Sequence, residues 1–318
     1  MPAGQSGARV WLALGIVYVV WGSTYLAIRV VVLAGLPPML SMSARFAAAA
    51  VLLAAVLAVR TGPRRLLLPP RQVGASAVVG LFLLLGGNGL VAVAEEEVPS
   101  ALAALLVATT PLWLVLMRSV TGDLPRAPTW VGTAVGFAGV AVLARPGGHE
   151  GDVTWAGTLL VVLATLLWAT GSMSAGRLPM PADPFASSVW QMAAGALGLL
   201  AGGTLRGEWA DVDLAAVEAS GWVALGYLVV FGSLVAYTAY AWLLGAAPIS
   251  LVSTYAYVNP VVAVVLGWAL LAEPVTAAVV LGGGLAVLGV LLVVRTERGG
   301  RRRQAVQAAA APAPAVKP

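Results

Sequence analysis

The sequence predicts an all-α integral membrane protein with ten transmembrane helices, arranged as two inverted repeats of five helices each. Three observations lead to this fold class. Hydrophobic residues make up 60% of the 318 residues and charged residues only 10%, whereas a soluble domain carries about 25% charged residues. The apolar residues form segments of roughly 20 residues, the length that crosses a bilayer. The second half of the chain also repeats the polar and proline pattern of the first half.

Ten apolar segments, separated by short connections, are long enough to span a membrane. They are predicted at 10–32, 39–59, 73–94, 99–118, 129–145, 154–176, 185–204, 220–243, 249–271 and 276–295. The first segment follows Arg9 without a small-residue cleavage site, so we expect a retained span rather than a signal peptide. The tail 299–318 is an arginine run followed by alanine and proline, a composition that predicts a disordered cytoplasmic segment.

The basic residues indicate how the spans are oriented. Most of the 18 basic residues lie at alternate span ends, for example Arg64 and Arg65 after the second span and Arg301 to Arg303 after the tenth. Because cytoplasmic loops carry the excess of arginine and lysine, these ends are predicted to face the cytoplasm. Both termini are therefore expected inside, and the connection that carries Glu95 is expected outside.

An internal repeat divides the chain into residues 1–147 and 152–298. Pro111 in the fourth span matches Pro260 in the ninth, 149 residues later. Two further pairs match at nearly the same offset, namely Trp21 with Trp168 and Arg45 with Gln191. Since five spans is an odd number, the second half enters the membrane from the opposite side. Inverted repeats of this kind are typical of secondary transporters, which bind their substrate at the repeat interface.

Several classes of function are disfavoured because their residues are missing. Cysteine is absent, so disulfides and thiolate metal sites are excluded. The single lysine is Lys317, which rules out an ATP-binding Walker A motif, and the single histidine is His149, which leaves no histidine dyad. We therefore expect no enzyme activity, no cofactor and no metal. The net charge of +5 comes from residues at span ends, so nucleic acid is not an expected partner.

Polar and aromatic residues inside the spans predict a pocket at mid-depth. Pro260 frees the carbonyl of Ala256 in an otherwise apolar helix, which a membrane protein tolerates where a cavity is lined. The candidate substrate-binding residues are Trp21, Ser23, Thr24, Tyr25, Arg45, Asn88, Trp168, Gln191, Tyr237, Tyr240, Tyr255 and Asn259. Candidates for gating or coupling are Glu95, Pro111 and Pro260. The second half, with Tyr255 and Asn259, is expected to form the more selective wall.

Each candidate has a second interpretation. Arg45 either offers a counter-charge to a substrate carboxylate, or forms a gate pair with Glu95, or reaches the outer headgroups. Trp21 and Trp168 either line the cavity or fill gaps left by small residues. The tyrosines either line the pocket or pack in the core with satisfied hydroxyls. Glu95 either gates and exchanges a proton or is a solvated charge beside Glu96 and Glu97.

Six motifs, spread over about residues 10–296, resemble the EamA-type family of the drug/metabolite transporter superfamily. They are WGSTYLAIR (21–29), RF (45–46), GGNGLVAVAE (86–95), VPS followed by ATTPL (98–112), FGSLVAY (231–237) and STYAYVNPVVAVV (253–265). The resemblance implies ten spans, two inverted repeats, a central cavity and alternating access in a bacterial inner membrane. It also implies that Trp21, Tyr25, Arg45, Asn88, Glu95, Pro111, Gln191, Tyr255, Asn259 and Pro260 stand at the family's recurrent positions.

The sequence thus predicts a secondary exporter of a small metabolite, an amino acid or related zwitterion, in a monomer or homodimer surrounded by lipid. Related proteins of this family export amino acids and assorted metabolites, so the resemblance itself does not fix the substrate. An alternative is broad efflux of lipophilic cations, which would require a carboxylate in the pocket. A non-transport alternative is an intramembrane enzyme or a structural membrane partner.

Overall fold

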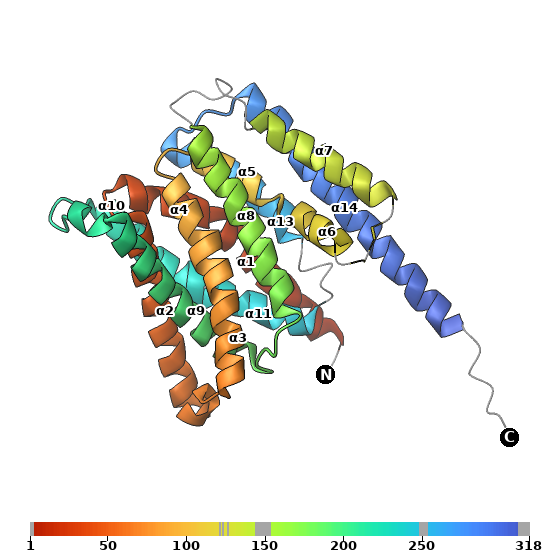
Figure 1. The fold of residues 1–318 in the computed structure, drawn as a ribbon, viewed down its shortest axis with the longest axis horizontal. Coiled ribbons are helices and arrows are strands. Elements are labelled where there is room, and N and C mark those ends of the chain that lie inside the picture. The colour runs from red at the N-terminus through yellow and green to blue at the C-terminus, as the bar shows by residue number, and fades with distance from the viewer. Residues whose placement is uncertain are drawn as a thin grey trace.

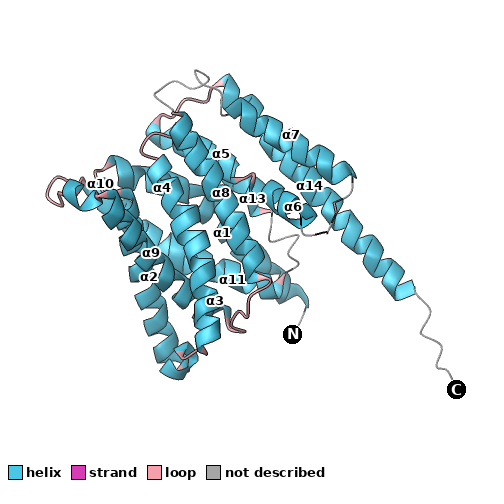
Figure 2. Ribbon diagram, in the orientation of Figure 1, coloured by secondary structure: helices cyan, strands magenta, loops and turns pink. Residues whose placement is uncertain are grey.

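The computed structural model describes the backbone of residues 3–120, 122, 124–125, 127–143, 154–247 and 254–310. Within these residues every regular element is a helix (Figure 2). The predicted all-α fold is therefore confirmed. His149, Asp123 and Ser253 lie outside the described residues, as do residues 311–318 of the tail.

The helices follow the order of the predicted spans. The first half contains α1 (Ala3–Leu33), α2 (Pro38–Thr61), η1 (Pro63–Leu66), α3 (Pro70–Gly80), η2 (Leu81–Gly89), α4 (Leu90–Ala94), α5 (Ser100–Val107), α6 (Thr110–Val120) and α7 (Ala127–Leu143). The second half contains α8 (Trp155–Ala175), α9 (Pro184–Arg206), η3 (Glu208–Asp211), α10 (Ala219–Tyr227), η4 (Leu228–Val235), α11 (Ala236–Ala246), α13 (Tyr255–Leu271) and α14 (Ala277–Ala310).

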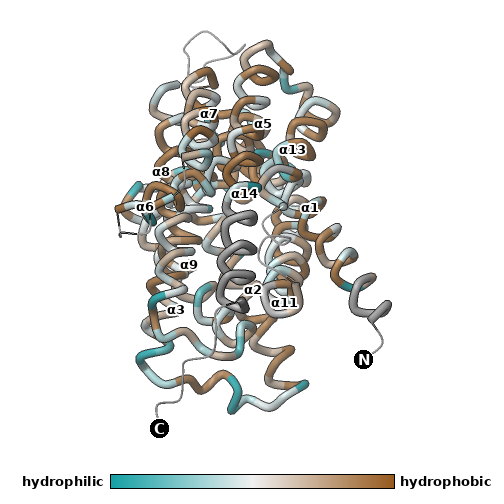
Figure 3. The backbone as a smooth tube through the Cα atoms, turned by 90° about the vertical axis from the view of Figure 1, so that its right-hand side faces the viewer, coloured by the Kyte–Doolittle hydropathy of each residue, from teal (hydrophilic) through white to brown (hydrophobic). Residues whose placement is uncertain are grey.

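In the described part of the chain, 8 helical stretches are long and apolar enough to cross a membrane, and two shorter apolar helices stand at the predicted fifth and ninth spans. Apolar residues fill most of the length of the helices, with hydrophilic residues concentrated towards helix ends and connections (Figure 3). Proline is the first helical residue of α2, α3 and α9. Proline suits this position because its missing N–H has no partner there in any helix.

The third and eighth spans contain π-helices that the sequence analysis does not predict. The segment η2 begins at Leu81 and η4 begins at Leu228, 147 residues later, so the repeat extends to this feature. Both segments join α-helices without a turn between them. Long π-helices are uncommon, and π segments are frequent at functional sites.

Pro111 and Pro260, which match in the repeat, affect their spans differently. The fourth span divides into α5 and α6 at Ala108 and Thr109, directly before Pro111. By contrast, α13 continues as a helix through Pro260. The tail also differs in part from expectation, since α14 continues beyond Arg298 to Ala310. Disorder of the tail stays a prediction.

The last helices of the two halves, α7 and α14, lie side by side at one edge of the molecule (Figure 1). The remaining spans form the main body, where α2 packs against α9 and α1 packs against α13. These two helix pairs each join one half to the other. They carry four of the predicted site residues, namely Arg45, Gln191, Trp21 and Asn259.

Candidate substrate cavity

A cavity of about 1180 Å³ lies between the two halves and receives side chains from both. Of the residues predicted to bind substrate, all but one line it: Trp21, Thr24, Tyr25, Arg45, Asn88, Trp168, Gln191, Tyr237, Tyr240, Tyr255 and Asn259. Pro111 and Pro260 line it as well, whereas Glu95 does not. The exception among the binding residues is Ser23. Its hydroxyl donates to the carbonyl of Val20 at 2.9 Å and bonds the hydroxyl of Tyr227 at 2.6 Å, so it joins α1 to α10.

One wall of the cavity is an aromatic cluster, formed by Trp21, Tyr237, Tyr240 and Tyr255. The Trp21 ring lies 4.9 Å from Tyr240, 5.3 Å from Tyr255 and 6.4 Å from Tyr237, measured between ring centroids. The rings of Tyr240 and Tyr255 meet edge to face at 5.8 Å. Three helices, α1, α11 and α13, therefore contribute to one continuous aromatic surface. Tilted and edge-to-face pairs are the favourable arrangement for such rings.

Arg45 is buried in the cavity wall, with only 4% of its surface exposed. Its Nε donates to the hydroxyl of Ser233 at 3.0 Å, and its Nη1 lies 3.6 Å from the sulfur of Met42. The guanidinium carbon also lies 4.6 Å from the ring centroid of Phe46. Within the described residues no carboxylate pairs with it. In this structure Arg45 neither pairs with Glu95 nor reaches out of the bundle, and its role as a counter-charge stays a prediction.

The two π-helices each receive a tryptophan from the other half of the chain. Trp21 donates from Nε1 to the carbonyl of Gly232 in η4 at 3.4 Å. Trp168 packs on Gly87 in η2, where a Cβ atom would come within 2.6 Å of the ring. The same η4 segment provides the hydroxyl that accepts from Arg45. These contacts place the π segments at the repeat interface, directly beside the cavity.

The second half contributes a chain of neutral hydrogen bonds. Tyr237 donates from its hydroxyl to Oε1 of Gln191 at 2.7 Å, and Nε2 of Gln191 donates to the hydroxyl of Ser187 at 3.0 Å. The Ser187 hydroxyl in turn lies 3.2 Å from that of Ser76 in α3. Gln191 thus has its oxygen and its nitrogen both engaged within the protein. This position holds its partners in place, whereas Arg45 keeps N–H groups unused.

Two asparagines lie in the wall. When its amide nitrogen is turned towards them, Asn259 donates to the carbonyls of Tyr255 at 3.1 Å and Tyr18 at 3.3 Å. It therefore joins α13 to α1. Asn88, in η2, makes a long contact of 3.5 Å with the carbonyl of Leu83.

The cavity extends to one end of the bundle. Its lining there includes Gly176 and Arg177, which are exposed, together with Arg118. These residues stand on the side that the sequence predicts to be cytoplasmic, which we call the inner end. Three arginines thus line the cavity, and none of the described aspartate or glutamate side chains lines it.

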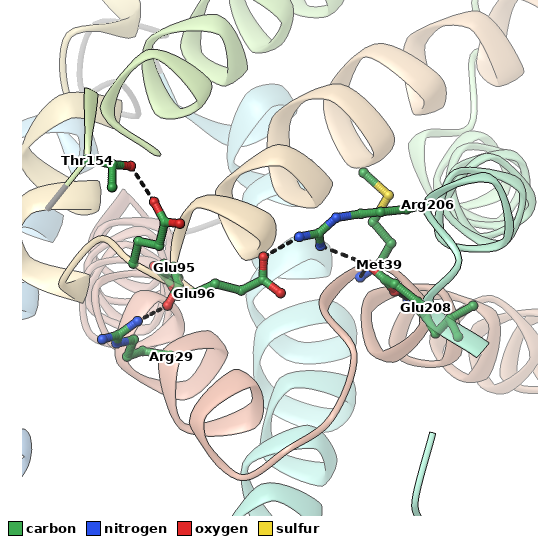
Figure 4. A network of polar contacts seen from close by, with 9 residues as sticks. Arg29, Met39, Glu95, Glu96, Thr154, Arg206 and Glu208 are labelled. Carbon is green, nitrogen blue, oxygen red and sulfur yellow. Dashed lines mark hydrogen bonds and ion pairs between the residues drawn. The ribbon is translucent and has the colours of Figure 1, made fainter. Parts of the chain in front are cut away.

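The opposite, outer end is closed by carboxylates from the connections between helices (Figure 4). Glu208 accepts from the backbone N–H groups of Met39 at 3.2 Å and Leu40 at 2.9 Å, which cap α2. Arg206 forms ion pairs with Glu208 and with Glu96. Glu208 thus joins the start of the second span to the connection that follows the seventh span. Through the pair of Arg206 with Glu96, the same connection is also joined to the connection that follows the third span.

A second group closes the same end beside α5. Glu273 accepts from the N–H groups of Ser100 at 2.8 Å and Ala101 at 3.0 Å, so it caps that helix. Arg29 donates to the main-chain carbonyl of Glu95 (Figure 4). The Glu95 side chain is completely buried. Among the described residues, the cavity thus reaches the end that carries Arg177, and the contacts of Glu208 and Glu273 close the opposite end.

Sequence reasoning missed Ser233, Gly232 and the two cavity arginines. Ser233 and Gly232 belong to the FGSLVAY motif, and their small size beside Tyr237 is the feature that could have indicated a close approach. Arg118 and Arg177 are among the basic residues at span ends, a pattern that predicts only the orientation of the spans. Arg177 lies on the connection between α8 and α9, whose path the sequence does not predict.

The fold and the cavity together define a class of protein, a polytopic α-helical membrane transporter built from two inverted repeats. The chain belongs to the EamA-like transporter family, whose family model matches residues 9–145 and again residues 155–295. The two matched ranges correspond to the two halves of the repeat.

Comparison of the chain with individual proteins agrees with this family membership. The chain is 40% identical over 284 residues to YedA of Escherichia coli strain K12, named an uncharacterized inner membrane transporter, with 88% of this chain and 89% of that protein covered. It is 30% identical over 307 residues to a protein of Streptantibioticus cattleyicolor named "Probable terminal-alkyne amino-acid exporter", with 93% and 96% covered. One solved crystal structure matches with a TM-score of 0.61 at 20% identity, covering 92% of this chain and 98% of the other. That structural match supports the fold alone.

Proposed function

We propose that this transporter exports a small metabolite that carries a carboxylate, an amino acid or a related zwitterion, across a bacterial inner membrane. The observation that carries the proposal is the Arg45 guanidinium, which lies in the cavity wall without a carboxylate partner among the described residues. Its position at the interface between the halves is where an inverted-repeat transporter binds its substrate.

The chemistry of Arg45 argues for an anionic group on the substrate. Removing a charged side chain from water costs several kcal/mol, on the order of what a well-placed counter-charge recovers. Ser233 satisfies only Nε of Arg45 with an oxygen acceptor. The remaining N–H groups form a planar fork that matches a carboxylate, which it can bind through two parallel hydrogen bonds. A substrate carboxylate would therefore complete the site.

The aromatic cluster suits the rest of a zwitterion. An ammonium group is attracted to the faces of tryptophan and tyrosine, by about 0.5–2 kcal/mol depending on desolvation. The same rings offer apolar area for an aliphatic or aromatic side chain. Trp21 and Arg45 both contact the Gly232–Ser233 step of η4, so the two halves of such a ligand would be bound close together. The name of the Streptantibioticus cattleyicolor relative, an amino-acid exporter, agrees with this substrate class.

Efflux of lipophilic cations is the weaker candidate. A cationic substrate would meet three arginines and no described carboxylate along the cavity lining. Like charges at about 4 Å repel by about 4 kcal/mol near a protein surface. The cation would have the aromatic cluster as its only attractive partner.

The mechanism we propose is alternating access. The halves 1–147 and 152–298 would rock about the cavity, so that the outer contacts of Glu208 and Glu273 break when the inner end closes. The present form, open towards Arg177, would be the one that receives substrate from the cytoplasm, with both termini on that side. The π-helices η2 and η4 place irregular backbone beside the cavity, where a span can bend.

Reconstituted protein in liposomes tests the proposal. Vesicles loaded with a mixture of labelled amino acids should release label faster than protein-free vesicles, and Arg45→Ala should remove the difference. Labelled tetraphenylphosphonium, a lipophilic cation, should not be released faster. If the wild-type protein moved the cation and no amino acid, the carboxylate-bearing substrate would be excluded. Arg60→Ala, at the exposed end of the same helix, is the matched control and should leave amino-acid release intact.

A further inference from the structure

We propose that Glu95 is a proton-binding site: closing the outer end of the cavity requires this side chain to take up a proton, so the pH of the outer medium controls the closure. The proposal rests on the exporter function for its consequence, but the site itself is argued from the contacts of Glu95 alone.

The geometry of Glu95 does not suit an ionised carboxylate. The side chain is 0% exposed, and neither Oε1 nor Oε2 has a hydrogen-bond partner. A buried carboxylate without hydrogen bonds is costly enough that the group binds a proton instead. The contrast with Glu273 is informative, because that carboxylate, buried at the same end, accepts from two backbone N–H groups. Of the two, only Glu95 lacks what would stabilise a negative charge.

The nearby arginine does not remove this problem. Arg29, on α1, donates to the main-chain carbonyl of Glu95 and not to its carboxylate. Burial is the largest influence and raises the pKa of Glu95 well above its usual range, Arg29 lowers it, and the charge of Glu273 raises it again. Arg29 thus holds the backbone at this corner in place, while the side chain stays neutral.

Other charged groups near this corner have partners of their own. Glu96 pairs with Arg206, and Glu97 is bonded by the hydroxyl of Thr154. The elements that pack against α4 are α8, η2, α2 and α1. Of these, α8 and η2 contain no charged residue, and Arg45 of α2 is bonded to Ser233. From α1, Tyr25 is the remaining titratable neighbour.

Tyr25 joins the site to the cavity. Its ring packs on the cluster that contains Ala94 and Val98, on either side of Glu95, and the residue also lines the cavity. The proton that closure requires comes from the outer medium, and it returns there when the outer end opens and water reaches Glu95. The pH of the outer medium therefore sets how readily the cavity closes on that side.

The direction of the pH effect follows from the two states. In the closed state the pKa of Glu95 is raised, and in an open, hydrated outer end it would return towards about 4.3. Between these two values, closing binds a proton, so low pH favours the closed outer end. As pH rises through this interval, the ratio of closed to open forms falls by up to tenfold per pH unit.

A single introduced cysteine can report this equilibrium, because the natural chain contains none. Ser100 is completely buried at the closed end and its hydroxyl has no partner, so Ser100→Cys loses no contact. The labelling rate of S100C with a maleimide is divided by the rate for the same variant unfolded in detergent, which removes the pH dependence of the thiol itself. We expect this normalised rate to rise several-fold or more from pH 5 to pH 8.

Adding Glu95→Gln to S100C should make the normalised rate low and independent of pH, because glutamine is neutral at every pH. Glu97→Gln is the matched control, since Glu97 is the exposed neighbour, and it should leave the pH dependence unchanged. Glu95→Asp, which keeps the titrating group, should preserve the dependence and guards against misfolding of the glutamine variant. A wild-type rate that does not change with pH would overturn the proposal, and so would a pH dependence that survives in E95Q.

Transport supplies the second measurement. With the labelled amino-acid mixture, E95Q should retain exchange between equal pH values and lose the acceleration caused by an acidic outer medium. If the normalised labelling rate of S100C did not depend on pH, the proton site at Glu95 would be refuted and the proposal of amino-acid export would be unaffected. If the labelling rate depended on pH but the protein moved no amino acid, only the proposed substrate class would be contradicted.

Discussion

Equivalent positions in the two halves contribute different chemistry to one cavity. Arg45 in α2 and Gln191 in α9 match in the repeat, and their helices pack against each other. Gln191 bonds to Tyr237 and Ser187 through both ends of its amide, whereas Arg45 retains unused N–H groups. Under the proposed function, the charged position binds the ligand and the neutral one stabilises the wall. The two halves would then share one frame, and the difference between Arg45 and Gln191 would determine which substrate is bound.

The tryptophans differ in the same way. Trp21 is the centre of the aromatic cluster and donates to Gly232. Trp168 packs on Gly87, and in the described part of the chain no other aromatic ring pairs with it. The first half thus provides Arg45 and the central ring, although the tyrosines that surround that ring come from the second half. The expectation that the second half forms the more selective wall stays a prediction.

Making the two halves alike at the position of Arg45 and Gln191 should have the largest effect on transport. Arg45→Gln places glutamine in both halves and removes a charge-assisted pair of hydrogen bonds, each contributing about 1.5–3 kcal/mol. We expect the amino-acid concentration for half-maximal transport to rise about 100-fold, equivalent to about 2.7 kcal/mol. Gln191→Ala should raise it far less, since Gln191 acts through Tyr237. Uptake into proteoliposomes measures this concentration. If it rose equally in R45Q and Q191A, the different roles given to Arg45 and Gln191 would be contradicted.

The outermost helices offer the opposite case, because there the halves are alike. Gly139 of α7 and Gly282 of α14 meet backbone to backbone, and a Cβ on Gly139 would come within 2.6 Å of the Gly282 carbonyl oxygen. Gly139→Ala should lower the free energy of unfolding by about 1–3 kcal/mol, as overpacking does. Gly282→Ala should have a similar cost, since its Cβ would lie 2.8 Å from Leu143.

Thermal unfolding of the purified variants measures this effect. Gly284→Ala is the control on the same helix, because nothing lies within 4 Å of its Cβ position. It should be neutral or slightly stabilising, since alanine favours a helix over glycine by about 1 kcal/mol. A destabilised G284A with an unchanged G139A would show that the α7–α14 contact is not the close packing described.

The sequence predicted much of this arrangement, for physical reasons that can be traced to residues. Apolar segment lengths determine the spans, and matched pairs such as Trp21 with Trp168 reveal the repeat. The cavity residues follow because a polar group such as Arg45 or Asn88 inside an apolar span must face protein or water. Ser23 failed this rule because a hydroxyl can also be satisfied by its own helix, here at Val20.

The remaining features depend on long-range contacts. The π-helices at Leu81 and Leu228 lie in leucine- and valine-rich stretches whose local preferences do not distinguish a π-helix from an α-helix. Glu208 and Glu273 cap helices of the other half, at sequence separations of more than 160 residues. Pairings of this kind follow from the packing of the halves and leave no local pattern.

The smallest effect that we predict again separates the halves, at the tryptophans. Trp21→Phe keeps a ring in the aromatic cluster but loses the hydrogen bond to Gly232 and part of the contact with Tyr240, and aromatic pairs contribute about 0.5–1.5 kcal/mol. We expect about a tenfold loss of amino-acid affinity at most, measured by titration calorimetry on the protein in detergent. Trp168→Phe should change affinity less than twofold, because its ring contacts Gly87 and helps hold η2 in place. If W168F weakened binding more than W21F, the ligand would lie against the first-half π-helix, and the aromatic cluster would be a structural element of the core.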